Sequence, residues 1–313
     1  MKVSHSISRF NTAKKTIITL GTFDGVHLGH QSILKKLVNA SENGKYESVV
    51  LTFFPHPRMI LNQENAMQLL NTIEEKTFLL EKFGINHLII HPFDEEFSKL
   101  SAEEFVKTIL VKQLNIHKII IGYDHRFGEN RTADINDLIL FGKKYTFEVA
   151  QINAEEINEI AVSSTKIRTA LLNGDIELAN QFLGYKYFFS GNVIKGKQLG
   201  RTIGFPTANI KLTENYKLIP KNGVYIVCST LNNKRVYGMM NIGHNPTVGE
   251  NNKTIEVHFF DVNEDLYDKT ISVSILKFIR NEEKFDSIDA LKFQLKKDQE
   301  FSKNYIETLT EGC

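Results

Sequence analysis

The chain has 313 residues, 42% hydrophobic and 24% charged, and its 38 Lys and Arg nearly balance its 37 Asp and Glu, leaving a formal net charge of +1. This balance excludes a global attraction to nucleic acid or anionic lipid, so any phosphate chemistry must come from local groups of residues. Two distant cysteines argue against a disulfide framework or a cysteine-based zinc site. Without a signal-like or membrane-spanning apolar run, we expect a cytoplasmic protein with no membrane or nucleic-acid partner.

The first 183 residues alternate between short apolar runs and helix-like segments. The apolar runs are TIITL (16–20), SVVLTF (48–53), HLIIH (87–91), KIIIGY (118–123) and TFEVAQI (146–152). The helix-like segments lie at 30–40, 71–84, 101–115 and 132–144. Continuous apolar runs of this length are typical of strands buried on both faces. The alternation therefore predicts an α/β domain built on an open parallel sheet.

The rest of the chain has a different rhythm. Strand-like segments separated by short turns lie at 187–196, 223–231, 235–243, 254–260 and 270–280, and only 287–309 has helical spacing. This pattern predicts a mainly-β domain, a barrel or a sandwich, with helix at its C-terminal end. We expect two domains, 1–184 and 185–313.

A pair of histidines follows the first predicted strand, in GTFDGVHLGH (21–30). His27 and His30 are three residues apart at the start of a predicted helix, so both can face the region above the end of that strand. A helix N-terminus supplies free N–H groups there, and two imidazoles could stabilise charge on a reacting phosphate. The alternatives are two ordinary histidines at a helix start, or a zinc site, for which no third ligand has suitable spacing.

A second phosphate-binding pattern occurs in AVSSTKIRTALLNGD (161–175). Ser163, Ser164 and Thr165 begin a predicted helix, and Arg168 follows one turn later. Hydroxyls, free N–H groups and a guanidinium on one turn suit a polyphosphate. An ordinary serine N-cap is the alternative interpretation.

The second half contains a glycine-rich basic loop, KGKQLGRTIGFPTANI (195–210). Its residues of interest are Gly196, Lys197, Gly200, Arg201, Gly204, Pro206, Thr207 and Asn209. Such a loop could close over phosphates. Thr207 and Asn209 leave the same face of an extended chain, and their oxygens are hard ligands suited to Mg²⁺. A routine hairpin loop is the alternative.

A carboxylate lies on one face of the strand IEVHFFD (255–261). Glu256, His258 and Phe260 share that face by alternation. Glu256 could take the proton from a hydroxyl that attacks a phosphate. A solvated charge on an amphipathic strand is the common alternative.

GTFDGVHLGH and SSTKIR together resemble the adenylyltransferase module of the H-x-G-H nucleotidyltransferases, and TFFPHP (52–57) and GYDHRFG (122–128) narrow the resemblance to bacterial bifunctional FAD synthetases. It covers about residues 14–183. The resemblance implies that His27 and His30 hold the α-phosphate of ATP, while Ser164, Thr165 and Arg168 hold the outer phosphates. It also implies a nucleotide site lined by Phe23, Asp24 and Gly25, and a flavin phosphate near Asp124, Arg126 and Phe127. His125 departs from the family, which usually has an aromatic residue there.

The second half is similar to the riboflavin kinase barrel over about 185–310, through GRTIGFPTAN, KNGVY (221–225), NIGHNPTVG (241–249) and the closing segment 278–298. The resemblance implies that Thr207 and Asn209 bind Mg²⁺ with ATP, that Glu256 is the catalytic base, and that Arg280 lies near flavin and phosphate. His244 and Asn245 stand where the family often has Arg, so we assign them no role.

The sequence thus predicts a bifunctional transferase. A riboflavin kinase barrel would make FMN from riboflavin and ATP, and an N-terminal nucleotidyltransferase domain would convert FMN and ATP to FAD and pyrophosphate. Two alternatives remain open. One is an H-x-G-H nucleotidyltransferase with another acceptor, which leaves the second half unexplained; the other is a flavin-binding protein without catalysis.

Overall fold

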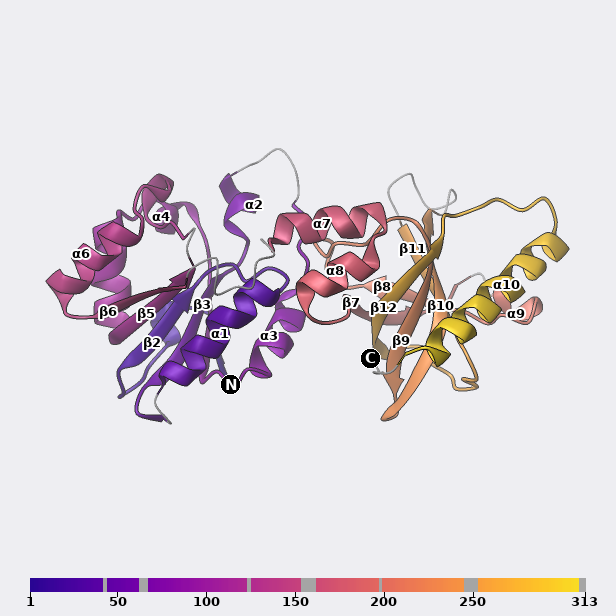
Figure 1. Cartoon of the computed structure of the whole chain (residues 1–313), viewed down its shortest axis with the longest axis horizontal. Helices are drawn as coiled ribbons and strands as arrows, with labels where there is room; N and C mark the ends of the chain where they lie inside the picture. Colours follow the sequence, from indigo (N-terminus) through magenta and orange to yellow (C-terminus); the bar gives the residue numbers. More distant parts are fainter. Residues whose placement is uncertain are drawn as a thin grey trace. The chain divides into compact units, whose positions relative to one another are not determined.

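The structure is a computed structural model that describes residues 1–41, 44–61, 67–122, 125–152, 162–196, 199–244 and 253–309. Its contacts divide the chain into two compact units, Met1–Ser163 and Ser164–Cys313. Figure 1 shows the helices and strands of both, coloured from indigo at the N-terminus to yellow at the C-terminus.

The first unit contains a six-stranded parallel sheet in the order β1-β4-β3-β2-β5-β6. Its strands are β1 (Lys2–Ser4), β2 (Thr16–Leu20), β3 (Glu47–Phe53), β4 (His87–His91), β5 (Ile116–Gly122) and β6 (Glu148–Ile152). The five predicted strands are confirmed. Strand β1 was not predicted from the sequence; it has only three residues and pairs in parallel with β4.

Helices fill the connections between these strands (Figure 1). They are α1 (Leu28–Ala40), α2 (Pro57–Leu61), α3 (Ile73–Glu81), α4 (Glu95–Ser98), α5 (Ala102–Glu104), the π-helix η3 (Phe105–Gln113) and α6 (Ile135–Tyr145), with 3₁₀ turns η1 (Ile7–Arg9) and η4 (Glu129–Arg131). Reciprocal capping boxes begin α3 at Thr72 and α5 at Ser101. The segment 101–115 is thus correctly predicted as helical, but most of it has π rather than α geometry.

The strand order fixes where this unit can bind a ligand. From the central β2 the chain passes to β3 and β4 on one side, and β5 then returns to the other side of β2. In open α/β sheets, ligands bind outside the carboxyl ends of the strands at such a switch point. Ile18, Val49 and Ile119, from β2 and its two neighbours, are fully buried in the core that supports this edge.

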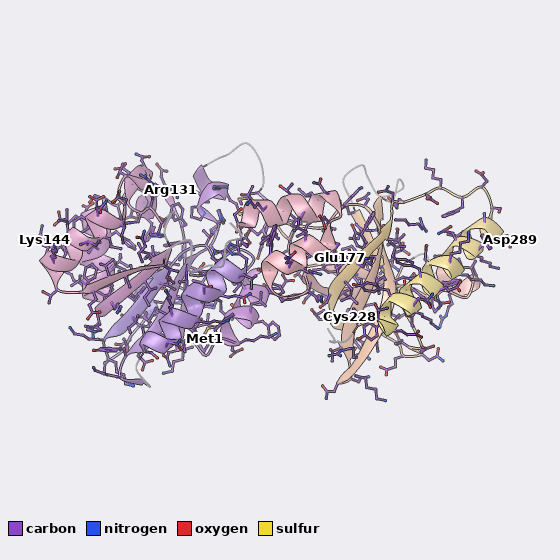
Figure 2. The ribbon with its side chains drawn as sticks, viewed as in Figure 1. Met1, Arg131, Lys144, Glu177, Cys228 and Asp289 are labelled. Carbon is purple, nitrogen blue, oxygen red and sulfur yellow. The ribbon has the colours of Figure 1, made fainter. Side chains whose placement is uncertain are left out.

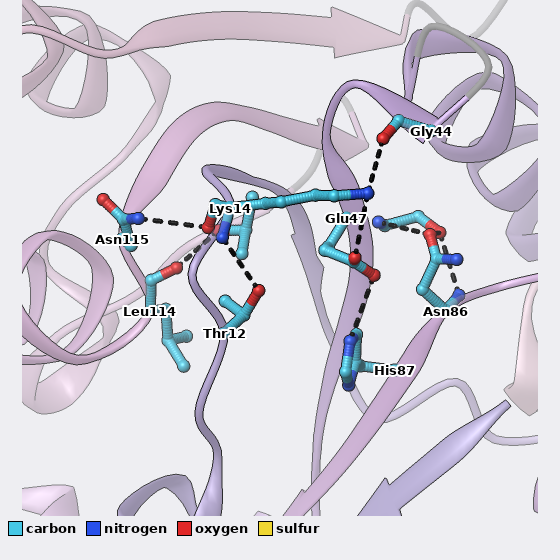
Figure 3. A network of polar contacts seen from close by, with 10 residues as sticks. Thr12, Lys14, Gly44, Glu47, Asn86, His87, Leu114 and Asn115 are labelled. Atoms are coloured by element: carbon cyan, nitrogen blue, oxygen red, sulfur yellow. Dashed lines mark hydrogen bonds and ion pairs between the residues drawn. The ribbon is translucent and has the colours of Figure 1, made fainter.

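A polar network lies at the amino ends of the strands, opposite the end that carries the switch point (Figure 3). Lys14 Nζ donates to the Gly44 carbonyl at 2.8 Å and lies 3.5 Å from Glu47, whose other oxygen is 3.2 Å from His87 Nε2. Burial lowers the pKa of His87 more than Glu47 raises it. This His–Glu pair joins the amino ends of β3 and β4, away from the switch point, and stabilises the sheet.

The second unit contains a closed antiparallel barrel in the order β10-β11-β8-β7-β12-β9. Its strands are β7 (Phe188–Ile194), β8 (Ala208–Leu212), β9 (Gly223–Leu231), β10 (Lys234–His244), β11 (Lys253–Phe259) and β12 (Thr270–Arg280). Its helices are α7 (Ser164–Asn173), α8 (Ile176–Leu183), α9 (Leu199–Thr202) and α10 (Ile288–Glu307). The barrel and the final helix are confirmed. The expectation of no helix between strands is wrong at α9, a single turn within the glycine-rich loop.

Helices α7 and α8 group with the barrel rather than with the sheet. Buried Asn180 of α8 donates to the Ile275 carbonyl of β12 at 3.0 Å and accepts from Tyr187 N at 2.6 Å. Glu177, labelled in Figure 2, forms an ion pair with Lys277 of β12 at 2.9 Å. The compact units therefore separate at Ser163, whereas the functional boundary near residue 184 stays a prediction.

Cys228 of β9, also labelled in Figure 2, is fully buried, and the other cysteine, Cys313, lies outside the described residues. Among the described residues, no helix combines the length and apolarity needed to cross a membrane.

Candidate active sites

The turn after β2 has an unusual backbone. Phe23, Gly25 and Val26 have φ angles of 47°, 85° and 37°. Left-handed φ is easy for glycine but strained for Phe and especially for β-branched Val. Such residues persist only where the surroundings over-determine the backbone, and they cluster at functional sites. The side chains of Phe23 and Val26 are buried, 2% and 1% exposed, so their packing in the core holds the turn in this conformation.

The two histidines meet at the start of α1. His27 is the N-cap, and its Nδ1 accepts from His30 N at 3.4 Å. The imidazole rings stack with centroids 3.7 Å apart and planes 19° apart, and the Phe23 ring lies 5.1 Å from that of His30. The two imidazoles do lie side by side, as predicted, but not because both lie on one face of the helix. His27 precedes the helix rather than lying on its face, and ring stacking aligns the pair.

His30 carries an unused polar atom. Its Nδ1 is buried and has no hydrogen-bond partner in the protein. Burial, and then the charges of His27 and Lys76, hold the pKa of His30 well below its usual value. The ring is therefore neutral at pH 7, with one N–H to donate. An anion at this helix N-terminus would meet that donor together with free backbone N–H groups.

Three contacts from neighbouring segments hold the turn. Asp24 Oδ1 accepts from Leu70 N at 2.9 Å. The Thr22 carbonyl accepts from Lys76 Nζ at 2.7 Å and from Thr52 Oγ1 at 3.2 Å. Asp24, expected in the nucleotide site, is 1% exposed and serves at least this structural role. Lys76 was not predicted as a site residue; the available signal was a charged residue on the helix face that also carries buried Leu79 and Leu80.

The SSTKIR segment does begin a helix. Ser164 is the first residue of α7, Ser163 and Ser164 are partly exposed, and Thr165 is exposed. Arg168 lies one turn later and is partly buried. Ser164, Thr165 and Arg168 belong to the second unit, whereas Ser163 and the two histidines belong to the first. Their shared role around one nucleotide stays a prediction.

The segment expected near the flavin is only partly described. Asp124 lies outside the described residues, and Arg126 is exposed. Phe127 is a core residue, 7% exposed, that exchanges backbone hydrogen bonds with Ala133. His125, which departs from the family pattern, stacks on Phe127 with ring centroids 6.3 Å apart.

In the second unit, three predicted residues come together across two strands. Antiparallel pairing sets Glu256 of β11 directly opposite Asn209 of β8. Thr207 Oγ1, just before β8, donates to Glu256 Oε2 at 3.3 Å. All three side chains are partly exposed, as a substrate site requires. A hydroxyl, an amide oxygen and a carboxylate form a hard-oxygen donor set that fits Mg²⁺.

Glycines let the loop approach this cluster. A Cβ on Gly196 would overlap the Asn209 side-chain amide, and a Cβ on Gly200 would overlap the Phe205 carbonyl. Gly204 has φ +87°, in the left-handed region. Arg201 is exposed, and Lys197 lies outside the described residues.

His258, on the same strand face as Glu256, fixes the end of the loop. Its Nδ1 lies 2.8 Å from the Pro206 carbonyl, and its ring contacts Phe205 with centroids 5.2 Å apart. His258 and Phe260 are 9% and 8% exposed. The strand face that carries Glu256 is therefore covered at His258 and Phe260.

Arg280 is held by the C-terminal helix. Its Nε and Nη2 donate to the Asp298 carboxylate at 2.8–3.1 Å, and Asp298 is 2% exposed. This bidentate pair fixes α10 to the end of β12. The expected role of Arg280 beside flavin and phosphate stays a prediction. The His244 side chain and Asn245 lie outside the described part of the chain.

A helix start at the switch point of a parallel sheet places the first unit in the class of nucleotide-binding α/β proteins. Comparison with known proteins is more specific. Residues 10–166 match the FAD synthetase family, and residues 183–306 match the riboflavin kinase family. The chain belongs to the bifunctional riboflavin kinase/FMN adenylyltransferases.

Individual relatives align over nearly the whole chain. The bifunctional riboflavin kinase/FMN adenylyltransferase of Buchnera aphidicola (subsp. Schizaphis graminum) is 40% identical, over 97% of this chain and 98% of the relative. That of Escherichia coli K12 is 36% identical over 96% of each. A crystal structure described as a macrolide-efflux protein from Streptococcus pneumoniae has a TM-score of 0.87 and 32% identity, covering 96% of this chain and 98% of its own.

Proposed function

We infer that the C-terminal domain (185–313) transfers the γ-phosphoryl group of ATP to the 5′-hydroxyl of riboflavin, giving FMN and ADP, and that the N-terminal domain (1–184) transfers AMP from a second ATP to FMN. The observation that carries this proposal is the convergence of Thr207, Asn209 and Glu256. An H-x-G-H nucleotidyltransferase with another acceptor would not need that second cluster. A flavin-binding protein without catalysis would not need a carboxylate beside a hard-oxygen site.

In the kinase reaction, Glu256 would accept the proton of the riboflavin hydroxyl while its oxygen attacks the γ-phosphorus. The bond from that phosphorus to the β–γ bridging oxygen breaks, and ADP leaves with the bonding pair. Thr207 and Asn209 would hold Mg²⁺, which supplies charge neutralisation to the ATP phosphates when bound. The glycines and basic residues of the loop, with Pro206, would close over ATP, and Arg280 would lie near flavin and phosphate.

In the adenylyl transfer, a phosphate oxygen of FMN would attack the α-phosphorus of ATP. The bond to the α–β bridging oxygen breaks, and pyrophosphate leaves. His27 and His30 would donate to the α-phosphate, while Ser163, Ser164, Thr165 and Arg168 hold the departing phosphates. Phe23, Asp24 and Gly25 would line the nucleotide site, and Asp124, Arg126 and Phe127 would contact FMN. The FMN phosphate is already ionised, so this step needs no general base.

One assay tests the proposal. Purified protein is incubated with riboflavin, Mg²⁺ and ATP, and the flavins are separated by chromatography. We expect FMN to form first and FAD to follow, both dependent on Mg²⁺. FMN alone would remove the adenylyl assignment, and unchanged riboflavin would favour a binding protein. We expect these reactions to take place in the cytoplasm, the location predicted from the sequence.

A further inference from the structure

Lys76 is a buried charged residue that neither proposed reaction uses. It lies on α3 and is 3% exposed. Its Nζ donates to the Thr22 carbonyl at 2.7 Å, and Thr22 is the residue just before the strained Phe23. The residue after Phe23, Asp24, accepts a hydrogen bond from Leu70 N, a few residues before Lys76 in the chain. The segment 70–76 therefore fixes the backbone that leads into the two histidines.

The ammonium group is also electrostatically coupled to the histidine pair. Burial lowers the pKa of Lys76 to about 8, against the opposing effect of Asp24. Lys76 is therefore mainly protonated at pH 7. His27 and Lys76 are the charged neighbours that, after burial, lower the pKa of His30. Asp24 is the charged neighbour that acts on Lys76.

Fold stability does not explain a lysine at this position. Burying a charge costs free energy, and an apolar side chain would continue the buried face formed by Leu79 and Leu80. The Thr22 carbonyl already has a second donor in Thr52 Oγ1. The neighbouring Asn71 is 1% exposed, and its side-chain Nδ2 and Oδ1 have no hydrogen-bond partner. An unsatisfied buried side chain is rare in native proteins and calls for an explanation, of which a role in catalysis is one.

We propose that Lys76 is a positioning residue for adenylyl transfer: it fixes the Thr22 carbonyl and places a positive charge behind His30, where negative charge develops on the α-phosphate. This inference rests on the roles proposed above for His27 and His30. A preorganised cation in a site of low polarity stabilises such charge without reorganising during the reaction. Lys76 acts through the turn and through His30, without contacting the reacting atoms.

The test compares three variants in FAD formation from FMN and ATP between pH 6.5 and 9.5. Lys76→Met removes the charge, Lys76→Arg keeps a charge that does not titrate, and Thr52→Val removes only the other hydrogen bond to Thr22. In the parent, kcat/KM should fall above about pH 8 as Lys76 loses its proton. Lys76→Met should lose roughly 10- to 100-fold at pH 7 and lack that descending limb. Thr52→Val should stay within a few-fold of the parent and keep the limb.

Lys76→Arg should retain activity within about tenfold and shift the descending limb to higher pH, because arginine stays protonated. If Lys76→Arg does not fold, the presence of the limb in the parent and its loss in Lys76→Met still support the proposal. A limb that persists in Lys76→Met, or equal losses in Lys76→Met and Thr52→Val, would overturn it. These outcomes leave the enzyme activity itself standing, whereas parental activity in His30→Ala would overturn the adenylyl site and this inference together.

Discussion

The two units assemble their candidate sites in different ways. In the first, Phe23, Asp24, His27 and His30 lie within eight consecutive residues, and one strained turn brings them together. In the barrel, Thr207 and Glu256 are 49 residues apart and meet because β8 and β11 pair in one register. A local site depends on how firmly the turn is held. A cross-strand site depends on register, since a slip of one residue would turn Glu256 to the other face.

The largest difference between the two sites is expected when Glu256 is changed. Glu256→Gln keeps the shape of the side chain and should leave the barrel folded, but it removes the proposed base. We expect a loss of about 10²- to 10⁴-fold in FMN formation, the usual contribution of general base catalysis. FAD formation from added FMN should continue near the parent rate. Equal losses with riboflavin and with FMN would mean that the units are coupled or that Glu256 is structural.

The reciprocal change is in the adenylyl site. His30→Ala or Arg168→Ala should lower FAD formation by roughly 10²- to 10³-fold, the effect of losing one preorganised donor to developing charge. FMN should still accumulate from riboflavin, which serves as the internal control. A variant that made FAD at the parent rate would remove His30 or Arg168 from the site.

A smaller effect is expected at the metal site. Thr207→Val keeps the shape of the side chain but deletes the hydroxyl that faces Glu256. Losing one interaction with a charged group should lower kinase activity roughly tenfold or more. Added Mg²⁺ should restore the rate only in part. An unchanged magnesium dependence would move the metal away from Thr207.

The smallest effect tests the approach of the loop to the strand. Gly196→Ala should disturb Asn209, because the new methyl group overlaps its amide. Overpacking of this kind costs about 1–3 kcal/mol. We expect kinase activity to fall about tenfold or less, with FAD formation from FMN unchanged in the same preparation. A kinase rate equal to that of the parent would show that the loop moves freely relative to Asn209.

The sequence predicted the fold well where the pattern of apolar residues follows directly from the burial of a strand or helix. Buried parallel strands appear as continuous apolar runs, so 16–20 and 87–91 were predicted with their observed ends. The histidine pair was also predictable, because adjacent residues on a strand–turn–helix stay adjacent in space. The pairing of Glu256 with Asn209 could not be predicted from the sequence. Alternation showed which face each side chain occupies but not the register that sets one opposite the other.

Other features depend on contacts that a single segment does not reveal. Lys76 looked like an ordinary helix residue because only its burial against the Thr22 carbonyl distinguishes it. The ion pair between Arg280 and Asp298, 18 residues apart, joins β12 to α10 and engages the guanidinium predicted for the flavin site. Helix α8 was assigned with the sheet by order along the chain, whereas Asn180 binds it to the barrel.

The central claim is that the two activities occupy separate sites that can be removed one at a time. The most direct test mixes the Glu256→Gln and His30→Ala variants and supplies riboflavin, Mg²⁺ and ATP. Alone, the first should leave riboflavin unchanged and the second should stop at FMN. Together they should make FAD, because FMN released by one variant serves the other. A mixture that still failed, although each variant retained its single remaining activity, would contradict two independent sites.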